Sequence, residues 1–142
     1  MTDRDTGTVE KTVRIGAPPE IVWRYWTDPT RIAEWWGPAS DLDPRPGGAY
    51  VVEMGGGPVM RGEYVELVPY ERIVFTFGWD PMPGGPDVPP GSTRVEVLLA
   101  ENDGDTVLTL RHTGLPVADA DQHDDGWAHF LPILAERAGR VA

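Results

Sequence analysis

Large apolar residues alternate with smaller or polar ones throughout residues 72–79, which is the pattern of a half-buried β-strand. A face that carries this much aromatic surface is stable in water only when a second layer of structure covers it. The sequence therefore predicts a sheet with a covering layer. The apolar face of this strand consists of Ile73, Phe75, Phe77 and Trp79.

Other segments repeat this alternation, separated by turns rich in glycine and proline. The turn Glu101-Asn102-Asp103-Gly104 has the composition of a tight hairpin, so the strands on either side of it are expected to pair. Further strands are predicted at 8–15, 50–54, 59–68, 93–100 and 107–112.

Two short helices are predicted after the first strand. Pro18-Pro19 suits a first helical turn, and Asp28-Pro29 combines an N-cap residue with a first-turn proline. Gly37-Pro38 then ends the second helix. Trp35 and Trp36 are adjacent, so on a helix only one of them is expected to face the core, while the other covers a cavity entrance or the sheet edge.

A long terminal helix is predicted to begin at Asp119, because Asp119 and Gln122 have the spacing of a capping box. Pro132 removes one backbone hydrogen bond, which predicts a kink near residues 128–132. The core-facing stripe of this helix is Trp127, Phe130, Leu131, Leu134 and Ala138.

The organisation is that of one α+β domain at 8–142 after a flexible N-terminus at 1–7. Residues 80–92 form a loop that is too short for a domain linker and long for a hairpin turn. We expect its tip to be mobile and the loop to lie at the mouth of any cavity.

Composition excludes several classes of function. The chain has 12 Lys+Arg against 23 Asp+Glu, a net charge of −11 that repels nucleic acid and anionic lipid surfaces. It contains no cysteine and no apolar run long enough for a membrane span. With no leader-like N-terminus, we expect a soluble, cytoplasmic protein without membrane insertion.

The order of a strand, two short helices, about six strands and one long helix resembles the helix-grip fold, a curved antiparallel sheet around a C-terminal helix. The specific motifs are Ala17-Pro18-Pro19-Glu20-Ile21-Val22-Trp23, Thr27-Asp28-Pro29, Trp35-Trp36-Gly37-Pro38, Gly47-Gly48-Ala49-Tyr50, Gly62-Glu63-Tyr64, Pro69-Tyr70-Glu71-Arg72-Ile73-Val74-Phe75-Thr76-Phe77, and Gly126-Trp127 followed by Leu131 and Leu134.

These motifs resemble the activator of heat-shock-protein-90 ATPase homologue family, a branch of the START-like (SRPBCC, Bet v 1-like) superfamily. The resemblance implies an internal apolar cavity and defines no reaction. Pro132 and the loop 80–92 depart from the family pattern. The additional N-terminal domain of the eukaryotic chaperone activators has no counterpart in this sequence, which weakens the case for a chaperone partner or a stress-response role.

In such a fold the inner sheet face is both core and cavity wall, so each aromatic residue on it has a structural and a ligand-binding interpretation. The predicted ligand-binding cavity consists of Trp35, Trp36, Tyr50, Val52, Met60, Tyr64, Phe75, Phe77, Trp79, Val97, Leu108, Leu110, His112, His123, Trp127, Phe130 and Leu134.

His112, Arg111 and His123 are the candidate polar anchors, and a lone inward histidine is more often a hydrogen-bonded core residue than a catalytic base. Neither serine lies in a nucleophile motif, and His123 and His129 miss the i, i+4 spacing of a metal pair. The glycine runs lack the residues of a phosphate loop. No metal and no cofactor are therefore predicted.

Three functions stay open at this point. The first is binding of a small hydrophobic ligand, such as a lipid, polyketide or aromatic metabolite, by a monomer or homodimer. The second is a cyclase- or aromatase-like enzyme of the same fold, in which His112 and a cavity tyrosine act as acid and base on an enolisable aromatic or polyketide substrate. The third is interaction with a protein partner, by analogy with the chaperone activators. The first is favoured, and no catalytic residue is assigned.

Overall fold

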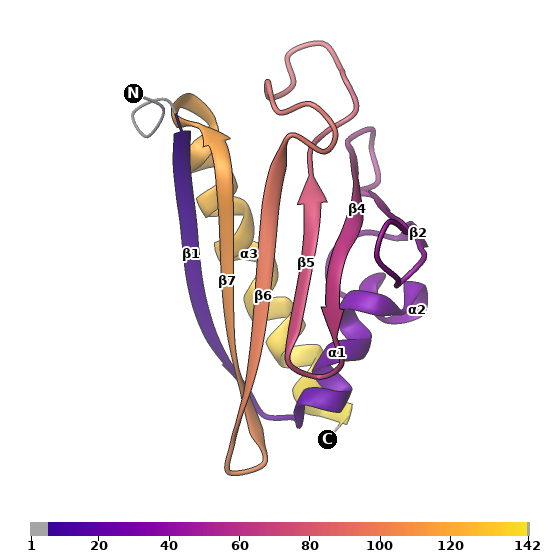
Figure 1. Cartoon of the computed structure of the whole chain (residues 1–142), viewed down its shortest axis with the longest axis vertical. Coiled ribbons are helices and arrows are strands. Elements are labelled where there is room, and N and C mark those ends of the chain that lie inside the picture. The colour runs from indigo at the N-terminus through magenta and orange to yellow at the C-terminus, as the bar shows by residue number, and fades with distance from the viewer. Residues whose placement is uncertain (1–5, 142) are drawn as a thin grey trace.

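The computed structural model describes residues 6–141, in which one antiparallel sheet of seven strands carries all three helices on the same face (Figure 1). The strand order is β1-β7-β6-β5-β4-β3-β2. The helix-grip fold is thereby confirmed. The elements are β1 (Thr6–Ile15), α1 (Pro19–Thr27), α2 (Pro29–Ile32), β2 (Ala39–Leu42), β3 (Ala49–Glu53), β4 (Val59–Val68), β5 (Arg72–Phe77), β6 (Thr93–Asn102), β7 (Asp105–Pro116) and α3 (Val117–Val141).

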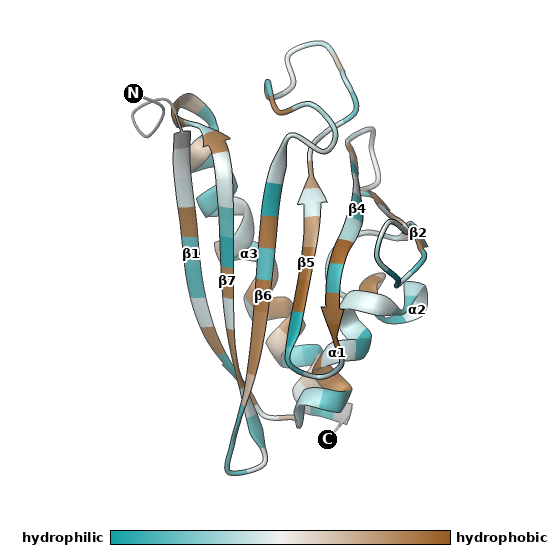
Figure 2. Ribbon diagram, viewed as in Figure 1, coloured by the Kyte–Doolittle hydropathy of each residue, from teal (hydrophilic) through white to brown (hydrophobic). Residues whose placement is uncertain are grey.

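The alternation predicted for the central strands is confirmed. Phe75 and Phe77 are buried beneath the helices, and Val95 and Val97 lie beside them on β6. Apolar and polar bands alternate along the strands in Figure 2. The strand β5 stops at Phe77, two residues earlier than predicted, and Trp79 forms a separate bridge to β4.

The hairpin between β6 and β7 is the tight turn that its sequence predicts. Asp103 and Gly104 have φ angles of 54° and 84°, the left-handed values of a two-residue turn that matches the strand twist. β7 is longer than the predicted 107–112. The edge strand β2 was not predicted, because its four residues contain one large apolar side chain, too few for a visible alternation.

Trp35 and Trp36 are both buried, with exposed fractions of 3% and 6%, so the expectation that only one faces the core is wrong. The reason is that α2 ends at Ile32, whose carbonyl accepts the backbone N–H of both tryptophans in the turn that follows. A turn is not bound by helical periodicity and directs both rings inward. The indole N–H of Trp35 donates to the carbonyl of Tyr25 at 2.8 Å.

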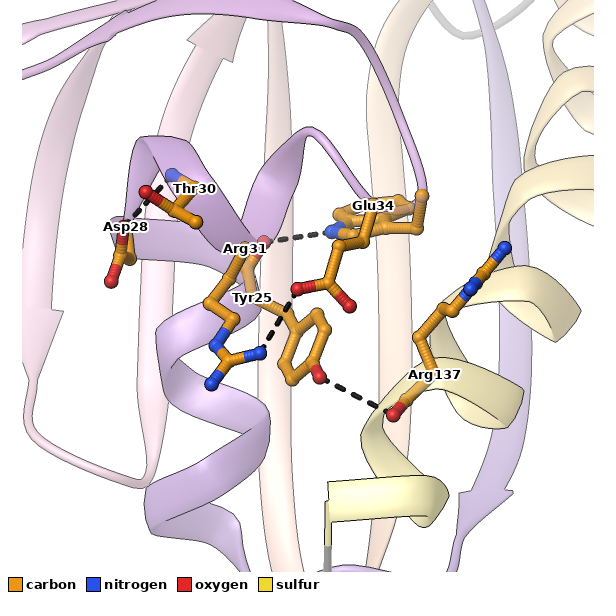
Figure 3. Close-up of polar contacts among 7 residues, drawn as sticks. Tyr25, Asp28, Thr30, Arg31, Glu34 and Arg137 are labelled. Carbon is orange, nitrogen blue, oxygen red and sulfur yellow. Dashed lines mark hydrogen bonds and ion pairs between the residues drawn. The ribbon is translucent and has the colours of Figure 1, made fainter.

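A small polar cluster joins α1 and α2 to the end of α3 (Figure 3). The Tyr25 hydroxyl donates to the carbonyl of Arg137 at 3.3 Å, and Arg31 pairs with Glu34 at 3.0 Å. The carboxylate of Asp28 accepts the backbone N–H of Thr30, which confirms the predicted N-cap. The Tyr25–Arg137 bond connects α1 to α3, whereas the other two contacts stabilise α2 and the residues beside it.

The long helix begins at Val117 directly after β7, so the predicted capping box at Asp119 is wrong. Asp119 lies inside the first turn, where a carboxylate still favours the positive end of the helix dipole. The helix continues through Pro132, which is exposed. The kink stays a prediction. Of the flexible N-terminus predicted at 1–7, residues 1–5 lie outside the described residues, and Thr6 and Gly7 belong to β1.

Candidate functional site

A pocket of about 190 Å³ opens beside the end of β5, between the loop 80–92 and α3. Its wall is mainly aromatic, which suits flat apolar molecules. The lining residues are Trp36, Met54, Phe77, Trp79, Pro86, Gln122, His123, Gly126, Trp127 and Phe130.

One stripe of α3 supplies half of this wall. Residues 122, 126 and 130 follow one another at i, i+4 spacing, and 123 and 127 lie beside them. Trp127 is 4% exposed and packs against Trp36 and Phe77, with ring centroids 5.2 and 6.1 Å away. These three rings form the floor of the pocket.

The loop 80–92 forms the opposite side through Pro86, and its base is folded back on the sheet. Gly78 permits this approach, because a Cβ there would lie 1.8 Å from the carbonyl oxygen of Pro89. The backbone N–H of Trp79 donates to Val88, whose side chain is buried. On the other side of Pro86, the backbone N–H of Asp80 donates to the carbonyl of Val59 at 2.9 Å. The loop is therefore anchored on both sides of Pro86, and the expected mobility of its tip stays a prediction.

An ion pair strengthens the anchor at Asp80, where the loop begins. Arg61 Nε and Nη2 donate to the two carboxylate oxygens of Asp80 at 2.8 and 2.9 Å. This bidentate contact lowers the pKa of Asp80 through the hydrogen bonds from Arg61. The start of the loop is thus held against β4.

His123 bridges the loop side and the helix side of the pocket. Its Nδ1 lies 2.8 Å from the carbonyl oxygen of Asp119, so Nδ1 carries the proton and donates. Its Nε2 accepts the indole N–H of Trp79 at 3.0 Å. Both ring nitrogens are therefore occupied, and the neutral Nδ1–H tautomer is the one that fits.

His112 lies deeper, in a chain of hydrogen bonds with a single direction. The Trp127 indole donates to Nδ1 at 3.1 Å, so His112 is protonated on Nε2 and donates to the Thr93 hydroxyl at 2.8 Å. Thr93 in turn donates to the carbonyl of Phe77 at 2.7 Å. Every donor and acceptor in this series of hydrogen bonds has a partner, so His112 is a core residue whose hydrogen-bonding capacity is satisfied.

This environment does not suit acid–base catalysis. Desolvation, with a smaller contribution from His123, lowers the pKa of His112 to about 3, and neither ring nitrogen is free to take a proton. Burial raises the pKa of the hydroxyls of Tyr50 and Tyr64. Neither tyrosine lines the pocket. The enzyme that pairs His112 with a cavity tyrosine therefore gains no support.

The structure divides the predicted cavity residues into two groups. Those that line the pocket are Trp36, Phe77, Trp79, His123, Trp127 and Phe130. Those that lie in the packed core, each no more than 3% exposed, are Trp35, Tyr50, Val52, Met60, Tyr64, Phe75, Val97, Leu108, Leu110, His112 and Leu134. Arg111, proposed as an anchor, is exposed on the outer face of the sheet.

Four lining residues were missed. Met54 directly follows β3 and continues the inward phase of Tyr50 and Val52, which is the signal that could have identified it. Pro86 lies in the loop 80–92, whose position over the sheet no alternation reveals. Gln122 was assigned to a cap and Gly126 to a family motif. The available signal was their spacing: both lie one turn apart on the face of α3 that also carries Phe130.

The fold and the motifs agree with a known family. The model of the Activator of Hsp90 ATPase homolog 1-like proteins matches residues 16–139. The chain belongs to this family. No curated protein matches the sequence.

Solved structures of the family and of its fold resemble the chain over most of its length. An AHSA1-like protein from Rhizobium etli is 41% identical with a TM-score of 0.74, covering 95% of this chain and 83% of that one. DynU16, from the dynemicin biosynthetic locus, is 27% identical with a TM-score of 0.75 over 91% of this chain, which spans 46% of DynU16.

The Aha1 dimer from Colwellia psychrerythraea, at 18% identity and a TM-score of 0.78, covers 94% of this chain and 96% of that one and shares the fold. Within residues 6–141, no helix is long and apolar enough to cross a membrane.

Proposed function

We propose that the protein binds one small, flat, mainly apolar molecule in the pocket between α3 and the loop 80–92. The observation that carries the proposal is the aromatic wall, in which rings from the turn after α2, from β5 and from α3 meet around unfilled space. Burying a flat ligand against such rings removes apolar surface from water on both partners.

The volume limits the ligand to a small molecule. A dry apolar cavity of about 150 Å³ is large enough to bind benzene. At about 190 Å³, this pocket holds a ligand of one or two fused rings, with any further part of it extending through the mouth. The relationship to a protein of the dynemicin biosynthetic locus supports a small-molecule ligand.

The other assignments stay predictions: a cytoplasmic location, the monomer or homodimer, and a chaperone partner. A dimer is known for one protein of the same fold.

Gly126 offers a direct test, because a side chain there fills the pocket without disturbing the core. A Cβ at Gly126 would meet no atom within 4 Å beyond its own helix backbone and sequence neighbours. We expect Gly126→Leu to weaken naphthalene binding by more than about tenfold, measured by quenching of tryptophan fluorescence. Stability to urea should stay equal or rise by about 1 kcal/mol, since leucine favours a helix more than glycine does.

Gly139→Leu is the matched control. Gly139 lies on the same helix, is exposed and does not line the pocket. Its added Cβ would come no closer than 4.0 Å to the carbonyl oxygen of Gly16. This variant should bind naphthalene as the unmodified protein does. Equal binding by the Gly126 and Gly139 variants would place the ligand elsewhere and refute the proposed site.

A further inference from the structure

The hydrogen-bonding groups around the pocket are nearly all committed to the protein itself. His123 uses both ring nitrogens, and the indole N–H groups of Trp79 and Trp127 donate to His123 and His112. A ligand that used any of these would have to break an existing hydrogen bond, which forfeits much of what it gained. They therefore form the wall and do not recognise polar groups.

Gln122 is different. It lies on α3, lines the pocket and is exposed to solvent, so it borders the open side of the pocket. Its amide forms no hydrogen bond with any residue of 6–141. An amide offers a carbonyl oxygen that accepts and an NH₂ group that donates. The Trp36 indole also forms no hydrogen bond within the described chain, but it can only donate.

Charge restricts the ligand as well. Within residues 6–141, no Asp, Glu, Lys or Arg lines the pocket, so a charged group of a ligand would leave water without gaining an oppositely charged partner there. The net charge of −11 on the chain further disfavours an anion.

We propose that the ligand is an electrically neutral aromatic molecule with one hydrogen-bonding group, and that the amide of Gln122 recognises this group at the pocket mouth. The inference rests on the proposed binding function and adds the ligand class and the residue that determines specificity. The aromatic body contributes affinity through buried area. The single amide selects which aromatic bodies bind.

The experiment compares naphthalene, 2-naphthol and 2-naphthoate at pH 7, in the unmodified protein and in Gln122→Leu. Leucine is close to glutamine in size and favours a helix, and position 122 is exposed, so the variant should fold normally. We expect it to bind 2-naphthol about 3- to 10-fold more weakly, the effect of one lost hydrogen bond. Naphthalene affinity should change less than about twofold.

Ala128→Leu is the control, since Ala128 is exposed on the same helix and does not line the pocket. It should leave both affinities unchanged. The inference is overturned if Gln122→Leu lowers the two affinities equally or leaves 2-naphthol unaffected, or if 2-naphthoate binds the unmodified protein more tightly than 2-naphthol. If naphthalene itself does not bind the unmodified protein, the proposed binding function is refuted. This outcome differs from one in which naphthalene binds but Gln122→Leu does not selectively weaken 2-naphthol binding.

Discussion

Replacement of Trp127 by alanine is expected to lower the free energy of unfolding by about 3–5 kcal/mol, because truncation of a buried aromatic side chain leaves a cavity that the core only partly refills. Trp127 packs its ring against Trp26, Trp36 and Phe77. The same change also leaves Nδ1 of His112 without its donor. Urea unfolding followed by circular dichroism measures the loss.

Two further variants separate the contributions. Trp127→Phe keeps an aromatic ring but removes the N–H, so it should cost about 1–2 kcal/mol. Trp23→Ala removes a partly exposed tryptophan that packs on Tyr70 at the surface, and should cost about 1 kcal/mol. If Trp127→Ala cost no more than Trp23→Ala, Trp127 would not be part of the core that joins α3 to the sheet.

The stability of the protein should decrease as the pH falls from 7.5 to 5. The pKa of His112 is about 3 in the folded chain and about 6.5 when unfolded, so the unfolded state takes up a proton first. The full contribution of neutral His112 is present above pH 6.5 and is lost progressively between 6.5 and 3. At pH 5 the loss from this residue is about 2 kcal/mol.

His112→Gln isolates this effect. Glutamine can accept from Trp127 and donate to Thr93 in place of the two ring nitrogens, but it does not titrate. Urea unfolding at pH 5 and 7.5 should show a smaller difference in the variant than in the unmodified protein. The other titrating groups are common to both. An unchanged pH dependence in the variant would show that His112 is not held neutral by burial.

Much of the fold follows from local pattern. The alternation in 72–79 identifies the central strand and its buried face, and Asp103-Gly104 fixes the hairpin, because both signals depend on neighbouring residues alone. Trp35 and Trp36 show the limit. Their burial depends on where α2 ends. The position of this end depends on contacts with the sheet and α3, which lie far away in the sequence.

The candidate site was predicted less completely for a related reason. Alternation shows which side chains face inward, but not whether the space beyond them is filled. Phe75 and Phe77 have the same phase on β5, yet Phe75 stacks on Tyr50 at 4.1 Å in the packed core while Phe77 borders the pocket. The difference comes from the loop 80–92, whose fold over the sheet end no local pattern encodes.

The indole N–H signals of a ¹⁵N-labelled sample give the most direct test of the binding proposal. The chain has six tryptophans, of which Trp36, Trp79 and Trp127 line the pocket, whereas Trp23 packs on Tyr70 outside it. Titration with naphthalene should shift the three pocket signals along one saturation curve and leave that of Trp23 unchanged. The aromatic pocket would not be a ligand-binding site if the three pocket signals stayed in place. The same would follow if they shifted together with the Trp23 signal and did not saturate.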